Sequence, residues 1–106
     1  METQYFQEDK LLLIRITEEL DHHTVEKIKR RADYEMERYI PKKIIFDFNQ
    51  VSFMDSAGIG LLLGRYKNIT LLGGKIEIIN ANIQIEKILQ ISGISKLIPI
   101  NKEECA

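Results

Sequence analysis

The sequence predicts an α/β fold in which helices pack against a mixed β-sheet. Short apolar runs typical of strands alternate with amphipathic segments typical of helices, in the order strand, strand, helix, strand, helix, strand, helix, strand. The first two strands are close enough to form a hairpin, whereas the later ones are separated by helices and require parallel crossovers. With 106 residues, we expect one domain spanning 1–106.

Composition predicts a cytoplasmic protein that binds neither nucleic acid nor membrane. Apolar residues make up 44% of the chain and charged residues 29%, and the net charge of −1 creates no field that would attract polyanions. The single cysteine, Cys105, can form no internal disulfide, which fits a reducing compartment. No apolar run is long enough for a signal peptide or a membrane span. Nothing in the sequence demands more than a monomer.

The N-terminal half is predicted to contain two strands, a long helix and a buried strand. The strands are a weakly apolar segment at Tyr5-Phe6 and the run 11–16, joined by a turn at 8–10. The segment 21–24 opens a helical pattern that Pro41 ends. Apolar residues recur at helical spacing along it: Val25, Ile28, Ala32 and Tyr39. The apolar run 43–48 follows as a buried strand.

The C-terminal half is predicted to hold two helices and two strands. A connector at 51–54 is expected to direct its apolar side chains inward, and Asp55-Ser56 starts the second helix. A turn at 73–74 leads into a strand at 75–79. Asn82 is the expected N-cap of the third helix and Gly93 its C-terminal stop. The segment 97–100 is expected to form a last, edge strand.

The strand–helix junction at Asp55-Ser56 is the segment whose residues most clearly indicate a functional site. In an open sheet, partners meet the crevice beyond the carboxyl ends of the strands, and Ser56 is expected there, at a helix N-terminus. The residues alone allow two interpretations. Either residue could simply cap the helix, or Ser56 could accept a phosphoryl group, which adds about −1.5 to −2 charges. Such charge at an interface would release a bound partner.

The glycines that follow do not form a nucleotide-binding loop. Gly58 and Gly60 have the first spacing of a dinucleotide fingerprint, but Leu63 stands where its third glycine is needed. We expect Gly60 and Gly64, four residues apart, to allow close packing of the helix on the sheet. Gly58 is expected to let backbone or a partner approach beside Ser56.

Enzymatic and metal-binding interpretations are also weak. The segment 54–58 lacks the first glycine of a nucleophile elbow, so no catalytic residue is assigned and the protein is not expected to be an enzyme. His22-His23 follow Asp21, but two adjacent residues of a helix point to different faces and no third ligand is evident. No metal or cofactor is therefore expected.

Two motifs resemble those of the STAS-domain anti-sigma-factor antagonists. The first is Phe53-Met54-Asp55-Ser56-Ala57-Gly58-Ile59-Gly60, continuing through Leu63-Gly64-Arg65-Tyr66-Lys67. The second is Leu20-Asp21-His22-His23-Thr24. The resemblance extends from about residue 11 to residue 100, and it implies the STAS fold, with helices packed against a mixed sheet.

The resemblance also implies a partner-switching cycle. The unphosphorylated antagonist binds an anti-sigma factor that is also a serine kinase, and so frees a sigma factor. The kinase, which brings its own ATP, then phosphorylates the antagonist on the serine corresponding to Ser56, and a serine phosphatase resets it. The residues implied in partner binding are Asp21, Asp55, Ser56, Ala57, Gly58 and Arg65.

Within the family, the sporulation antagonists that act on the anti-sigma F factor are the leading version of this function. A general stress-response antagonist is the alternative, followed by a nucleotide-binding STAS protein. The sequence departs from the family at Glu18, where relatives often have glycine. It also ends six residues after Ile100, so the C-terminal helix of the family is expected to be missing or very short.

Overall fold

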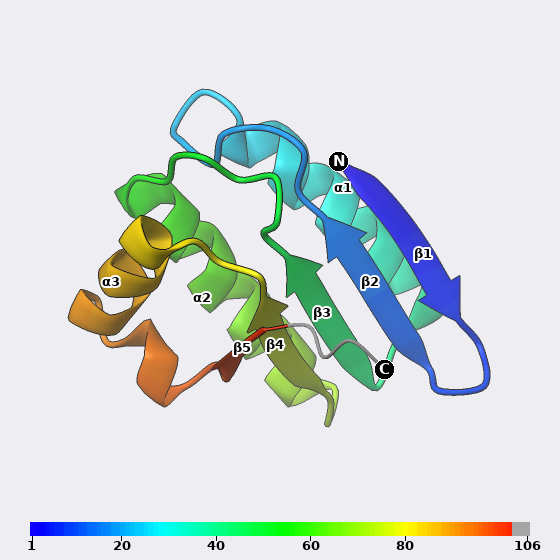
Figure 1. Cartoon of the computed structure of the whole chain (residues 1–106). Coiled ribbons are helices and arrows are strands. Elements are labelled where there is room, and N and C mark those ends of the chain that lie inside the picture. The colour runs from blue at the N-terminus through cyan, green and yellow to red at the C-terminus, as the bar shows by residue number, and fades with distance from the viewer. Residues whose placement is uncertain (103–106) are drawn as a thin grey trace.

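The structure is a computed structural model and describes residues 1–102. A five-stranded mixed sheet lies at the centre of the molecule (Figure 1). The strands are β1 (Glu2–Phe6), β2 (Leu11–Arg15), β3 (Lys43–Asp47), β4 (Lys75–Ile79) and β5 (Ile100–Asn101). The helices are α1 (Val25–Tyr39), α2 (Ser56–Leu71) and α3 (Ile83–Ile91), with a 3-10 turn at Ile94–Lys96. The predicted order of elements is confirmed.

The strands lie in the sheet in their order along the chain. The hairpin β1–β2 is antiparallel, and every later pair is parallel, with a helix in each crossover. Helices α1 and α2 cover one face of the sheet, and α3 lies beside its β4–β5 side (Figure 1). Both crossovers that lead into α1 and α2 therefore leave the sheet at the carboxyl ends of β2 and β3.

The core lies between the sheet and the two helices α1 and α2. Successive strand residues point to opposite faces, and alternate residues of β2, β3 and β4 are almost fully buried: Leu12, Ile14, Ile44, Phe46, Ile76 and Ile78. Ile28 and Ala32 of α1 and Leu62 and Ile69 of α2 pack against them. Burial of this surface is the main stabilising contribution to the fold.

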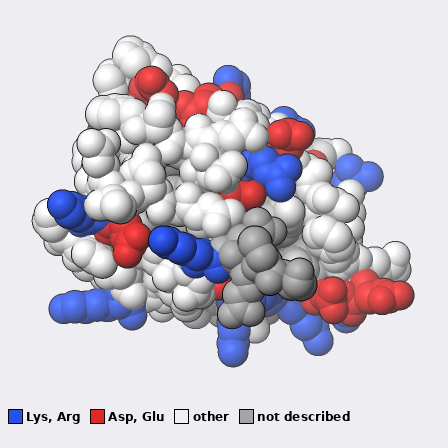
Figure 2. Space-filling model, viewed as in Figure 1, with Lys and Arg blue, Asp and Glu red and all other residues white. Residues whose placement is uncertain are grey.

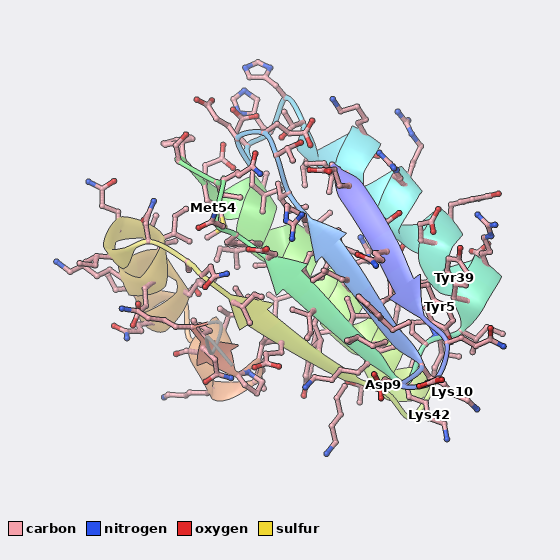
Figure 3. The ribbon with its side chains drawn as sticks, turned by 45° about the vertical axis from the view of Figure 1, so that its right-hand side comes forward. Tyr5, Asp9, Lys10, Tyr39, Lys42 and Met54 are labelled. Carbon is pink, nitrogen blue, oxygen red and sulfur yellow. The ribbon has the colours of Figure 1, made fainter. Side chains whose placement is uncertain are left out.

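The hairpin strand β1 is joined to α1 by an aromatic contact. The rings of Tyr5 and Tyr39 are stacked, with centroids 4.2 Å apart, and Figure 3 shows the two side chains facing each other. This contact covers the end of α1 just before Ile40, whose left-handed conformation ends the helix.

Three details of the sequence-based expectation are wrong. Residues 21–24 form a turn, and α1 begins only at Val25. The segment 97–99 is not a strand, because the 3-10 turn precedes it and pairing with β4 begins at Ile100. A Cβ added at Gly60 or Gly64 would meet no atom within 4 Å, so these glycines do not bring the helix close to the sheet.

No described helix is long and apolar enough to cross a membrane. After β5 the description reaches only Lys102, and no helix follows that strand within residues 1–102. Cys105 lies outside the described residues.

Candidate partner-binding and phosphorylation site

The start of α2 lies at the edge of the sheet where β2, β3 and β4 end. We call the loop 20–24, the connector 51–54 and the first turn of α2 (55–58) the rim. Val51 and Met54 are buried in the hydrophobic core and so hold the connector in place. Phe53, however, is 51% exposed, which corrects the expectation that the whole connector directs its apolar side chains inward.

Asp55, and not Ser56, caps the helix. Asp55 has extended backbone geometry, and its Oδ1 accepts a hydrogen bond of 2.9 Å from the N–H of Ala57. Ser56 is the first helical residue and is exposed, and its hydroxyl makes no hydrogen bond to any residue in the range 1–102. The structure therefore shows which of the two residues caps the helix and leaves the serine hydroxyl exposed, while phosphorylation of Ser56 stays a prediction.

The second oxygen of Asp55 connects the helix to the loop 20–24. Asp55 Oδ2 lies 3.2 Å from Nδ1 of His22 and accepts a 3.3 Å hydrogen bond from the His22 N–H. Partial desolvation acts to raise the pKa of Asp55, but the hydrogen bonds from His22 and Ala57 outweigh it, so this pKa is lowered. Asp55 is therefore a carboxylate at neutral pH, held between two elements.

The loop 20–24 is joined to the connector as an extra rung of the sheet. Leu20 and Met54 form a parallel bridge; the N–H of Leu20 donates to the carbonyl of Phe53 over 3.0 Å, and the N–H of Asp55 to the carbonyl of Leu20 over 3.3 Å. Within the loop, Asp21 Oδ1 accepts the N–H groups of His23 (2.9 Å) and Thr24 (3.2 Å). Asp21 thus shapes the loop beside the helix start.

Gly58 is the residue that allows this close approach. A Cβ at this position would lie 2.5 Å from Cγ of Met54 and 3.0 Å from the carbonyl oxygen of Leu20. The expectation that Gly58 admits neighbouring backbone is confirmed. Asp21, Asp55, Ser56, Ala57 and Gly58 therefore all lie on the rim, and their contribution to partner binding stays a prediction.

Arg65 lies away from these five residues and is buried. Only 5% of its side chain is exposed, and its Nε is 3.0 Å from Oδ1 of Asp33 on α1. The contact lacks the geometry of a hydrogen bond, so its attraction is electrostatic. In this structure Arg65 links α1 to α2, and its contribution to partner binding stays a prediction.

Sequence reasoning missed two exposed apolar residues, Phe53 on the rim and Ile83 near it. Phe53 precedes Met54 in an extended segment, where neighbouring side chains point to opposite sides, so one of the two had to face outward. Ile83, at the start of α3, is 73% exposed. Its neighbour Asn82 donates a hydrogen bond of 3.3 Å to the carbonyl of Val51, which brings the start of α3 to the connector.

The two histidines differ from the sequence-based expectation. They lie in a turn rather than on opposite faces of a helix, and their ring centroids are 3.9 Å apart. Among residues 1–102, no group of three or more histidine, cysteine, aspartate or glutamate residues could hold a metal ion.

Comparison with known proteins identifies the family. The STAS domain family matches residues 3–104. The chain is 35% identical over 94 residues to an anti-sigma F factor antagonist of Paenibacillus polymyxa, covering 89% of this chain and 80% of that protein. It is 27% identical over 92 residues to an anti-sigma-B factor antagonist of Listeria monocytogenes, covering 86% of this chain and 79% of that protein.

A solved structure agrees with this assignment. The Bacillus cell fate determinant SpoIIAA in its phosphorylated form is 30% identical, has a TM-score of 0.73, and is matched over 97% of this chain and 92% of its own. The family match, the sequence relatives and the fold agree, and the chain belongs to the STAS-domain family, among the anti-sigma factor antagonists.

Proposed function

We propose that the chain binds an anti-sigma factor through the rim, and that phosphorylation of Ser56 releases it. The observation that carries this proposal is that Asp55 and Ser56 have separate roles at the start of α2. Asp55 supplies the helix cap, so the Ser56 hydroxyl is exposed and can be modified without loss of a hydrogen bond on which the fold depends. Protein binding, rather than catalysis by this chain, is the activity that follows.

The modification is a phosphoryl transfer from ATP held by the partner. The Ser56 oxygen attacks the γ-phosphorus, the bond from that phosphorus to the ADP oxygen breaks, and the hydroxyl proton passes to a base of the kinase. The product carries about −1.5 to −2 charges at the N-terminus of α2, where the helix dipole favours negative charge. The modified protein can therefore stay folded.

The same charge is unfavourable in an interface. The surface over the start of α2 carries few charged side chains (Figure 2), so a phosphate changes it strongly. Misplaced charge between bound surfaces costs several kcal/mol, and about 1.4 kcal/mol is a factor of ten in affinity. We infer that one phosphate is enough to separate the complex.

The anti-sigma F factor is the partner that the relatives favour, which would place the protein in sporulation. The Paenibacillus relative named for sigma F is 35% identical, whereas the Listeria relative named for sigma B is 27% identical. The exposed Phe53, next to the capping Asp55, is the apolar contact that we expect such a partner to cover. A serine phosphatase would return Ser56 to its binding form, and the cycle would run in the cytoplasm.

The test is to mix the protein with its cognate anti-sigma F kinase and ATP, and to map added phosphate by peptide mass spectrometry. We expect one phosphate on Ser56 and loss of the complex. Ser52 is the matched control, because it is an exposed serine four residues earlier, in the connector that precedes α2. Ser56→Ala is expected to abolish phosphorylation while retaining binding, and Ser52→Ala to change neither. Phosphate on Ser52 instead would contradict the proposal.

A further inference from the structure

The two histidines of the loop 20–24 lie on the rim but have no function in the phosphorylation cycle proposed above. Both are exposed, and 70% of the His22 side chain is open to solvent. Their rings lie side by side, with an angle of 40° between the ring planes. Histidine is the side chain whose charge changes near neutral pH, so its place beside a phosphoacceptor matters.

His22 is held in place by the residue that precedes the phosphoacceptor. Asp55 Oδ2 bonds both the ring nitrogen and the backbone N–H of His22, and Asp55 Oδ1 is bonded to Ala57. Consecutive Cα atoms are about 3.8 Å apart. A phosphate on Ser56 would therefore be attached one residue after the carboxylate that contacts the imidazole.

Phosphorylation would place two anionic groups next to each other at this point. The titratable groups in contact with His22 are Asp55 and His23, and Asp21 lies in the same loop, bonded to the His23 and Thr24 N–H groups. Within residues 1–102, no lysine or arginine forms an ion pair with Asp55, and His22 is its cationic partner when protonated. The imidazole is thus the group placed to balance the added charge.

We propose that His22 takes up a proton when Ser56 is phosphorylated, and then bridges the phosphate and Asp55. This inference rests on the proposed function only in taking Ser56 as the modified residue. The proton comes from solvent, and the N–H bond formed on the ring is the only covalent change. His22 is a positioning residue that orders the phosphate over the rim and makes the phosphorylated state sensitive to pH near neutrality.

The experiment uses phosphoserine incorporated at position 56 during translation, so that no kinase is needed. The ring signals of His22 and His23 and the phosphorus signal are followed by NMR from about pH 5 to 9, with and without the phosphate. We expect the pH at which the His22 ring protonates to rise by about one unit on phosphorylation, since a nearby opposite charge shifts titration by about 1–3 units. The titration of the phosphate is expected to move to lower pH.

Substitutions separate this role from a purely structural one. His22→Gln is expected to return the phosphate titration to that of an exposed phosphoserine. His22→Arg introduces a side chain that is always charged, so the phosphate should again titrate at lower pH than an exposed phosphoserine. His23→Gln is the matched control, because no described contact joins His23 to Asp55, and it should change the phosphate titration little.

Identical His22 titrations in the two forms would overturn the inference, as would a phosphate titration unaffected by His22→Gln. Failure of the kinase to modify Ser56 would instead refute the proposed function. The two failures are distinguishable, because the titrations use phosphoserine installed without the kinase.

Discussion

The two ends of the sheet differ in how far their connections depend on side chains. At the end opposite to the rim, backbone groups pair with backbone groups: the N–H of Lys42 donates to Lys10 over 2.8 Å, and the N–H of Lys75 donates to Lys42 over 2.9 Å. Figure 3 shows Lys10 and Lys42 together at this end and Met54 at the other. At the rim, backbone pairing between Leu20 and the connector is supplemented by the side chains of Asp21 and Asp55. The side chain of Asn82 joins the start of α3 to the same connector.

This difference indicates which end can be switched. Backbone pairing is insensitive to a nearby charge that leaves the main chain in place, whereas a carboxylate that bonds two elements responds to charge and to protonation. The rim joins α2 to the loop 20–24 through Asp55, one residue before Ser56. We expect a phosphate added there to alter interactions at the surface, while the backbone pairing at the opposite end preserves the fold.

One tightly packed glycine lies at each end of the sheet, and substitution of Gly74, at the end opposite to the rim, has the largest expected effect. A Cβ at Gly74 would lie 2.7 Å from Cδ1 of Ile69 and 2.9 Å from the carbonyl oxygen of Lys42. Ile69 is fully buried and branched, so it cannot move aside easily. We expect Gly74→Ala to lower the free energy of unfolding by about 1–3 kcal/mol, measured by urea denaturation. The folded variant should bind the anti-sigma factor with unchanged affinity, and weaker binding would break the comparison.

Two exposed apolar residues compare the ends as binding surfaces. Phe53 on the rim is 51% exposed, and Leu71, near the opposite end, is 86% exposed. Phe53→Ala is expected to weaken binding of the anti-sigma factor about tenfold, as truncation of a buried interface anchor does. Leu71→Ala, although it removes the more exposed side chain, should leave the affinity unchanged in the same calorimetric titration. Equal losses would place the partner elsewhere.

Gly58→Ala is expected to be milder for stability than its counterpart at Gly74. The nearest atom to the added Cβ is Cγ of Met54, which is buried but unbranched and so adapts more readily than Ile69. Alanine is also favoured over glycine in a helix by about 1 kcal/mol. Displaced Met54 would, however, shift the connector, so we expect about threefold weaker partner binding. A variant that loses as much stability as Gly74→Ala would show that the rim is as rigid as the other end.

The smallest effect is expected in the pH dependence of stability. Because the pKa of Asp55 is lowered on folding, this carboxylate stabilises the folded state above its unfolded pKa, near 3.8, and this contribution is lost as the pH falls through the lower folded value. Asparagine caps helices equally well. Asp55→Asn should therefore melt slightly below the wild type at about pH 6, and the difference should disappear as the pH falls below the lowered pKa of the folded state. A difference in melting temperature that does not change with pH would mean that the charge of Asp55 does not contribute to stability.

The elements could be predicted from the sequence because their signals are local. The alternation of apolar runs, Pro41 after the first long helix and Asn82 before the third all act within a few residues. The cap at 55 could not be separated from 56, because both residue types favour that position and only backbone geometry distinguishes them.

Errors arose where distant segments meet. Gly60 and Gly64 share a helix face, but spacing does not reveal whether that face meets the sheet, and it does not. The burial of Arg65 against Asp33 depends on how α1 and α2 pack, and the contact of His22 with Asp55 joins residues 33 positions apart. Such tertiary contacts leave no periodic pattern in the sequence.

The most direct test compares the protein carrying serine with the protein carrying phosphoserine at position 56. Affinity for the anti-sigma F factor is measured by calorimetry, and backbone amide signals are compared by NMR. We predict at least tenfold weaker binding of the phosphorylated form, with changed amide signals confined to the rim and absent around Lys42 and Gly74. Equal affinity, or signal changes that extend to the opposite end of the sheet, would contradict a switch based on local charge.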